Sequence, residues 1–160
     1  MKRFKLNYIE IVLFILFAAG VYYVMSIPKE IECAPQQFTQ AYISINSRTY
    51  TLSKADTACK VQQGIQNKLN FDYSGMIFIF PTEEKRTFWM KNTIFPLSIA
   101  FLDEEGRIVD MQDMEIEPTG RWDFMLKQYS SSQAAKYAIE VPRGWFSQES
   151  IKLGDTVEIR

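Results

Sequence analysis

The sequence predicts a mainly β domain of the sandwich or barrel type, with one short helix, behind an N-terminal transmembrane helix. Three observations carry this prediction: many short apolar or alternating runs between turn residues, one segment with a helix cap, and one long apolar run near the N-terminus. The chain has 160 residues, 47% of them hydrophobic and 14% aromatic, enough for one core. We therefore expect an anchor over residues 1–28, a linker over 29–40 and a β domain over 41–160.

The anchor is predicted from an apolar run, residues 11–27, that follows Lys2, Arg3 and Lys5. Its length of about 17 residues lies at the short end of what spans a membrane as a helix. The alternative is a secretory signal that is removed, but the exit at residues 22–28 has bulky residues where cleavage needs small ones. Basic residues before the helix favour an inside N-terminus. We expect a single-pass protein of the cell membrane with its C-terminal domain outside.

Two cysteines suit an extracytoplasmic domain, where disulfides persist. Cys33 lies in the expected linker and Cys59 in the expected helix. The sequence leaves two alternatives open, a Cys33–Cys59 disulfide or two free thiols. The spacing of the two cysteines does not resemble a zinc or redox motif.

The elements of the domain follow from hydrophobic pattern and turn residues. Residues 41–52 form a predicted hairpin around Asn46 and Ser47, and a second hairpin surrounds the turn at residues 103–106. A helix is expected from Asp56 or Thr57 to about residue 67. The other expected elements are strands at 75–80 (ended by Pro81), 87–90, 97–102, 107–114, 135–141 and 156–159, and a long loop at 117–133.

Charge and composition exclude several function classes. The net charge is -1, and about -3 without the first 28 residues, which is unsuited to neutralising phosphates, so we predict no nucleic-acid partner. Histidine is absent, which excludes Ser-His-Asp and Cys-His catalysis and removes the commonest metal ligand. Asp110, Asp113, Glu115 and Glu117 lack dense Ca²⁺-loop spacing and are interpreted as a solvated face. We predict no cofactor and no metal.

A specific series of motifs runs through the domain. It comprises Gly75-Met76-Ile77-Phe78, Phe88-Trp89-Met90-Lys91-Asn92-Thr93, Pro96-Leu97, Gly106-Arg107-Ile108-Val109, Ile139-Glu140-Val141, Gly144-Trp145 and Gly154-Asp155. This series resembles the DUF192 family of bacterial and archaeal proteins, over about residues 52–159. The resemblance implies a jelly-roll-related β domain and no reaction, because the family has no assigned function. Two departures stand out: Ser98 replaces the family's usual aspartate, and residues 64–68 depart from its Gly-Leu-Met-x-Arg pattern.

The segment Trp89–Thr93 is the main candidate for ligand binding. Lys91 and Asn92 place a cation and an amide beside the Trp89 indole, a set that suits an anion or a polar ligand. The alternative is structural, because Asn92 and Thr93 can hydrogen-bond their own backbone in a turn.

Two further residues complete the predicted ligand set. Glu140 lies on a strand, where it either pairs with Lys91 or Arg107 or faces solvent. Ser131 resembles a family serine position; without histidine only Lys91 is available as its base, so a capping role in a polar loop is favoured.

The long loop carries Trp122 and Phe124 among polar residues. Exposed aromatics there would form a partner surface; the alternative is that the loop folds back and buries them. Taken together, the sequence predicts a non-catalytic binding or accessory module for an envelope glycan or a partner protein. The alternative is an envelope hydrolase or transferase using Lys91, Glu140 and Ser131.

Overall fold

The computed structural model describes residues 15–17, 33–68, 74–118 and 120–160. Two compact units are present, Met1–Glu32 and Cys33–Arg160. Residues 15–17 are helical, and the rest of the predicted membrane span lies outside the described residues. Within the described ranges, no helix has the length and apolar character needed to cross a membrane.

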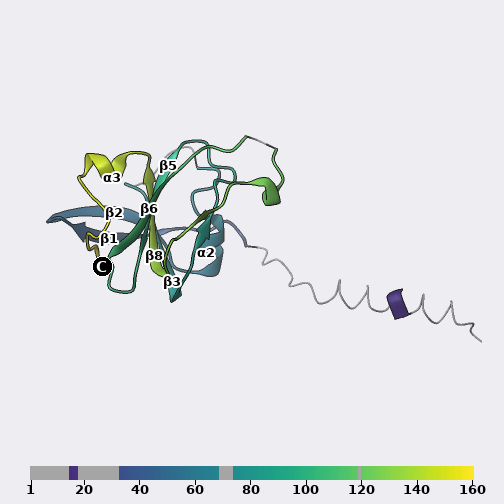
Figure 1. Cartoon of the computed structure of the whole chain (residues 1–160), viewed down its shortest axis with the longest axis horizontal. Coiled ribbons are helices and arrows are strands. Elements are labelled where there is room, and N and C mark those ends of the chain that lie inside the picture. Colours follow the sequence, from purple (N-terminus) through teal and green to yellow (C-terminus); the bar gives the residue numbers. More distant parts are fainter. Residues whose placement is uncertain (1–14, 18–32, 69–73, 119) are drawn as a thin grey trace, which may run out of the picture. The chain divides into compact units, whose positions relative to one another are not determined.

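The unit Cys33–Arg160 is built on one curled seven-stranded sheet (Figure 1). The strand order is β6-β5-β8-β3-β2-β1-β9, and every neighbouring pair is antiparallel except β2 and β3. These strands are β1 (Thr39–Ile45), β2 (Arg48–Ala55), β3 (Met76–Glu84), β5 (Leu97–Leu102), β6 (Ile108–Met114), β8 (Ala135–Pro142) and β9 (Glu158–Ile159). A two-stranded ribbon joins β4 (Thr87–Phe88) and β7 (Tyr129–Ser130). The prediction of a mainly β domain is confirmed.

The two edges of the curled sheet meet near the start of β6. An isolated antiparallel bridge joins Arg107 to Thr156. Beside it, Val157 N donates to Gly106 O at 2.8 Å, and Ile108 N donates to Asp155 O at 2.9 Å. The chain entering β6 therefore closes against the chain entering β9, which gives this end a barrel-like form.

The three central strands, β3, β5 and β8, bury side chains on both faces. One hydrophobic cluster contains Ile77 and Val141 and is covered by α3 (Trp145–Gln148). The opposite cluster contains Phe78 and Phe101, and the Phe88 ring meets both edge to face at centroid distances of 4.9 and 5.7 Å. Residues 138–141 of β8 are therefore buried, whichever face of the sheet they point to.

Local sequence signals fix the turns and the helix start. Asn46 and Ser47 adopt φ of 49° and 64°, the two positive values that a tight β1–β2 hairpin turn requires. Helix α2 (Ala58–Gln63) is capped by the Thr57 hydroxyl, which accepts from Lys60 N. It ends at Gly64 with φ of 50°, earlier than predicted, because glycine leaves the helical region at little cost.

Five elements differ from the prediction. β3 continues through Pro81 to Glu84, because Pro81 lies within the register shift of the β3–β8 pairing, where no ladder donor is needed. β4 ends at Phe88 instead of residue 90. The predicted long loop contains β7 and the short helix η1 (Asp123–Met125), and α3 follows Gly144.

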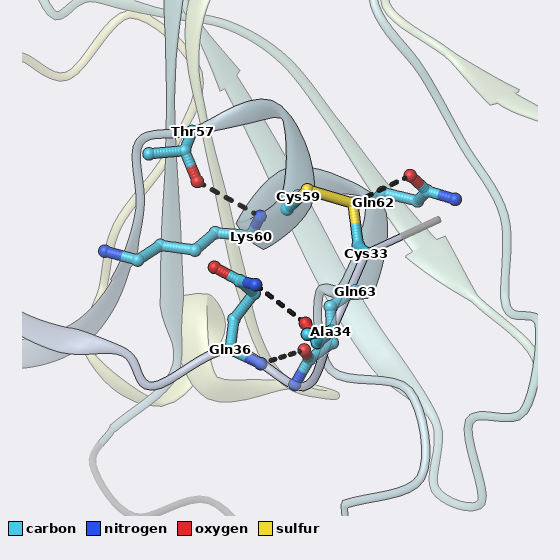
Figure 2. The surroundings of a disulfide bond; sticks show 8 residues. All are labelled: Cys33, Ala34, Gln36, Thr57, Cys59, Lys60, Gln62 and Gln63. Atoms are coloured by element: carbon cyan, nitrogen blue, oxygen red, sulfur yellow. Dashed lines mark hydrogen bonds between the residues drawn. A yellow bond between two sulfur atoms is a disulfide. The ribbon is translucent and has the colours of Figure 1, made fainter. Parts of the chain in front are cut away.

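The structure joins Cys33 to Cys59 by a disulfide, which ties the segment before β1 to α2 (Figure 2). Gln36 N also donates to Gln63 Oε1 at 2.7 Å, and Phe38 packs against the core cluster that contains Phe78. Part of the segment expected to be a linker is therefore attached to the domain.

Replacing Cys33 and Cys59 by serine in the full-length chain is expected to lower the free energy of unfolding by about 3 kcal/mol. The bridge closes a loop of 26 residues, and its loss restores conformational entropy to the unfolded chain. Denaturant unfolding with and without reductant measures the effect. Reductant should destabilise the parent and leave the double variant unchanged; equal unfolding midpoints for parent and variant would contradict the prediction.

Candidate functional site

The Trp89–Thr93 segment forms a tight turn that backbone hydrogen bonds hold. Asn92 has φ of 53°, a left-handed conformation that asparagine tolerates better than most residues. Thr93 N donates to Met90 O at 3.2 Å, and Asn67 N donates to Asn92 O at 3.0 Å. Asn92 thus contributes through its backbone to joining this turn to the chain after α2.

Lys91 connects the turn to the long loop. Its Nζ lies 2.6 Å from Asp123 Oδ2 and 5.6 Å from the centroid of the Trp89 ring. Arg121 likewise pairs with Glu117 at 3.0 Å. Both cations beside the turn therefore have anionic partners.

A groove of about 330 Å³ lies between the turn and the loop. In Figure 1 the loop between β6 and β8 extends away from the sheet. The groove is lined by Lys91, Asn92, Thr93, Ile94, Ile116, Glu117, Pro118, Gly120, Arg121, Asp123 and Leu126. Its walls combine apolar side chains with paired charges, a lining suited to a ligand that has apolar groups and polar backbone.

Large apolar side chains stand exposed around this groove. Trp122 is 71% exposed and Phe124 83%, so the alternative in which the loop buries them is wrong. The reason is that η1 is a single turn without a buried residue, so it presents these side chains outward. We use the name aromatic-loop surface for the set Ile94, Ile116, Trp122, Phe124 and Met125, all of which are exposed.

Glu140 is buried, not solvated, and only 4% of it is exposed. It lies on the central strand β8, opposite Met76 of β3 and Ile99 of β5. Glu140 does point to the face opposite Ile139 and Val141, as the alternation along β8 predicts, but this face of the strand is covered too. Neither expected partner is near: Lys91 pairs with Asp123, and Arg107 with Asp103. Burial raises the pKa of the Glu140 carboxyl to about 8.

The Glu140 cavity, of about 40 Å³, lies between β8 and the end of α2. It brings together three residues of the predicted ligand set: Glu140, Trp89 and Thr93. The other lining residues are Val61, Gln62, Gln63, Gly64, Ile65, Gln66, Phe78 and Phe88. No local sequence pattern points to the glutamines, because their position beside Glu140 arises only when α2 packs on the sheet.

Ser131 has a structural role in the turn between β7 and β8. Its hydroxyl accepts from Arg86 N at 3.0 Å and donates to Gln133 O at 2.6 Å. Ser131 is 3% exposed and lines neither the groove nor the Glu140 cavity. The proposed catalytic set of Lys91, Glu140 and Ser131 is therefore not assembled in one site.

Ser98, which replaces the family's usual aspartate, lines a third pocket of about 450 Å³. Ser98 Oγ donates to Asp113 Oδ1 at 2.6 Å and accepts from Gly144 N at 3.1 Å. Arg143 in turn bridges Asp113 at 3.4 Å and Glu115 at 2.5 Å. Ser98 thus anchors the turn before α3 to β6, a role that the sequence comparison indicated only by marking Ser98 as a departure.

Asp113 and Glu115 of the expected solvated face are exposed, and all four acidic residues also pair with neighbouring groups. Asp113 and Glu115 pair with Arg143, Glu117 pairs with Arg121, and Asp110 accepts from Ser132 N at 2.8 Å. Across the part of the chain that the structure describes, no three acidic or thiol groups gather in a way that would hold a metal ion.

The fold and the site geometry define this chain as a mainly β domain with surface pockets, in which Lys91, Glu140 and Ser131 do not form one catalytic set. The family model described as "Uncharacterized ACR" matches residues 41–159, and the chain belongs to this family, DUF192. No curated protein matches the chain.

Two solved structures share the fold. One, from Sinorhizobium meliloti 1021 and suggested to be a transcription regulator, has 21% sequence identity and a TM-score of 0.64; the match covers 79% of this chain and 98% of that one. The other, a protein of unknown function from Novosphingobium aromaticivorans DSM 12444, has 22% identity and a TM-score of 0.60, with 83% and 93% covered. At these identities the likeness concerns the fold alone.

Proposed function

We propose that this domain is a non-catalytic binding module that holds an extended apolar segment of a partner protein on its aromatic-loop surface. The observation that carries the proposal is the exposure of five large apolar side chains beside a groove of about 330 Å³. Exposed apolar patches rimmed by polar residues are typical of protein interaction sites. Tryptophan and phenylalanine are also suited to act as anchors of such interfaces.

The charges around the groove support a protein segment over an anionic ligand. Lys91 and Arg121 are paired with Asp123 and Glu117, which leaves the rim polar and close to neutral. Lys127 N donates to Glu117 Oε1 at 2.8 Å, which fixes the loop beyond η1. A rim of this kind provides donors and acceptors for a peptide backbone, while the aromatic side chains provide the apolar contact.

The setting that we propose is the outer face of the cell membrane. The basic N-terminus and the apolar run at residues 11–27 support a single-pass anchor with the domain outside. The Cys33–Cys59 bridge agrees with an oxidising compartment. The module would then recruit its partner at the membrane surface.

The experiment is site-specific cross-linking in intact cells. A photoreactive phenylalanine analogue at position 124 of the full-length chain is expected to give one discrete cross-linked product. Trp122→Ala should reduce its yield at least about tenfold, because hot-spot residues contribute roughly 1.4 kcal/mol or more.

A matched control is available at Leu153, which is 62% exposed but lies in the turn before β9. The same analogue at position 153 should give no corresponding product. Equal labelling from both positions, or no product from position 124, would reject the proposed surface.

A further inference from the structure

The Glu140 cavity contains a carboxyl group without a partner. Every fully enclosed side-chain nitrogen or oxygen of the described residues has a hydrogen-bond partner. The Glu140 carboxyl makes no hydrogen bond or ion pair with any described residue, although the residue is only 4% exposed. Its oxygens are therefore not fully enclosed, and they have access to the cavity that Glu140 lines.

Among the residues that the structure describes, no charged group pairs with this carboxyl. Gln62 and Gln63 of α2, Gln66 in the turn after it and Phe78 of β3 line the cavity. The three described lysines on these neighbouring segments have other partners: Lys60 pairs with Asp56 at 3.0 Å, Lys91 pairs with Asp123 at 2.6 Å, and Lys68 lies over the Phe38 ring at 4.7 Å. Burial alone raises the pKa of Glu140. An ionised Glu140 would therefore need a cation from outside the domain.

The walls of the cavity suit a cation with a slim apolar stem. Phe78, Phe88 and Trp89 contribute aromatic rings, whose faces attract cations. Thr93, Gln62 and Gln66 contribute polar side chains that can accept from N–H groups. A volume of about 40 Å³ is roughly three times what one water needs, which is sufficient for an ammonium group and its first carbons. Trp89 is 41% exposed and marks the opening to solvent.

We propose that this cavity is a binding site for a primary alkylammonium group, with the Glu140 carboxylate as its counter-ion. The inference does not depend on the aromatic-loop surface, because its key residue lies on β8 and not on the loop. When the cation enters, the Glu140 carboxyl releases its proton to solvent and forms an ion pair with the ammonium. Binding therefore couples to pH: below pH 8 the ligand must displace a proton, and the apparent affinity falls with the ionised fraction.

The test uses n-propylammonium as the probe and the full-length chain labelled with ¹³C at its glutamate carboxyls. Titration by NMR is expected to shift the Glu140 carboxyl resonance toward that of a carboxylate. The apparent Kd should fall about 50-fold between pH 6 and pH 8, as the ionised fraction rises. The ammonium, whose pKa is about 10, stays charged over this range.

Three controls make the outcome decisive. Glu140→Gln keeps the size and should abolish binding, with its fold checked by near-UV circular dichroism. Glu149→Gln, which removes a carboxylate that pairs with Arg48 and does not line the cavity, should leave the Kd unchanged. n-Propanol, the uncharged analogue, should not bind. Binding that survives in Glu140→Gln, equal binding of propanol, or no binding at pH 9 would overturn the proposal and leave a cavity that holds water only.

Discussion

Gly106→Ala is expected to destabilise the domain by about 4 kcal/mol and to lower its Tm by more than about 10 °C. Gly106 has φ of 78°, where an added Cβ costs about 1–2 kcal/mol. That Cβ would also lie 2.4 Å from the Val157 carbonyl oxygen, so the two chain segments must separate. Their separation breaks the bond from Val157 N to Gly106 O, which helps to join the edges of the curled sheet.

Gly154 supplies the matched control for this variant. Its φ is 89°, but an added Cβ would meet no atom within 4 Å. Gly154→Ala should therefore show the backbone strain alone, about 1–2 kcal/mol. Denaturant unfolding of both variants separates the two contributions. Equal losses would show that closure of the sheet at Gly106 contributes little to stability.

The sequence predicted those features whose causes are local. The Asn46-Ser47 turn, the Thr57 cap and the hairpin between β5 and β6 each depend on neighbouring residues, and the structure has all three. Continuous apolar runs bounded by turn residues also identified the central strands. The DUF192 membership rested on short motifs and is confirmed over residues 41–159.

The features that escaped prediction depend on contacts between distant segments. The alternation along β8 places Glu140 on the opposite face from Ile139 and Val141, but only the packing of α2 and the β4 region shows that this face is covered. The ion pair of Lys91 with Asp123 spans 32 residues and has no local signature. Exposure of Phe124 likewise depends on the path of a long loop, which composition does not determine.

Buried Glu140 should make the stability of the domain fall as the pH rises. Burial raises the pKa of its carboxyl from 4.5 to about 8, so the folded state binds a proton that the unfolded chain releases. The protonated Glu140 carboxyl stabilises the folded state fully below pH 4.5. This stabilisation is lost progressively up to pH 8, at about 1.4 kcal/mol per pH unit. The expected total loss of unfolding free energy is roughly 4–5 kcal/mol, measured by denaturant unfolding in a pH series without amines.

Glu140→Gln should remove this slope, because glutamine stays neutral at every pH. The variant should match the parent near pH 4.5 and exceed it in stability by about 4 kcal/mol at pH 9. Glu149→Gln provides a comparison of opposite sign. Hydrogen bonds from Tyr50 and Arg48 lower the pKa of Glu149, so its contribution is present above the usual carboxyl range and lost in acid.

The two glutamates thus have opposite roles: Glu149 stabilises the fold as an anion, whereas the fold keeps Glu140 protonated. Glu149→Gln should lower stability at neutral pH and leave the decline between pH 5 and pH 8 in place. If Glu140→Gln showed the same decline as the parent, the carboxyl would be hydrated in the folded state. A decline confined to proteins with Glu140 would instead establish an enclosed proton at the centre of the sheet. Deprotonating Glu140 in the folded state is unfavourable at low pH, and an entering cation must offset that free energy. The pH dependence of stability therefore also sets the pH range in which the cavity can bind a cation.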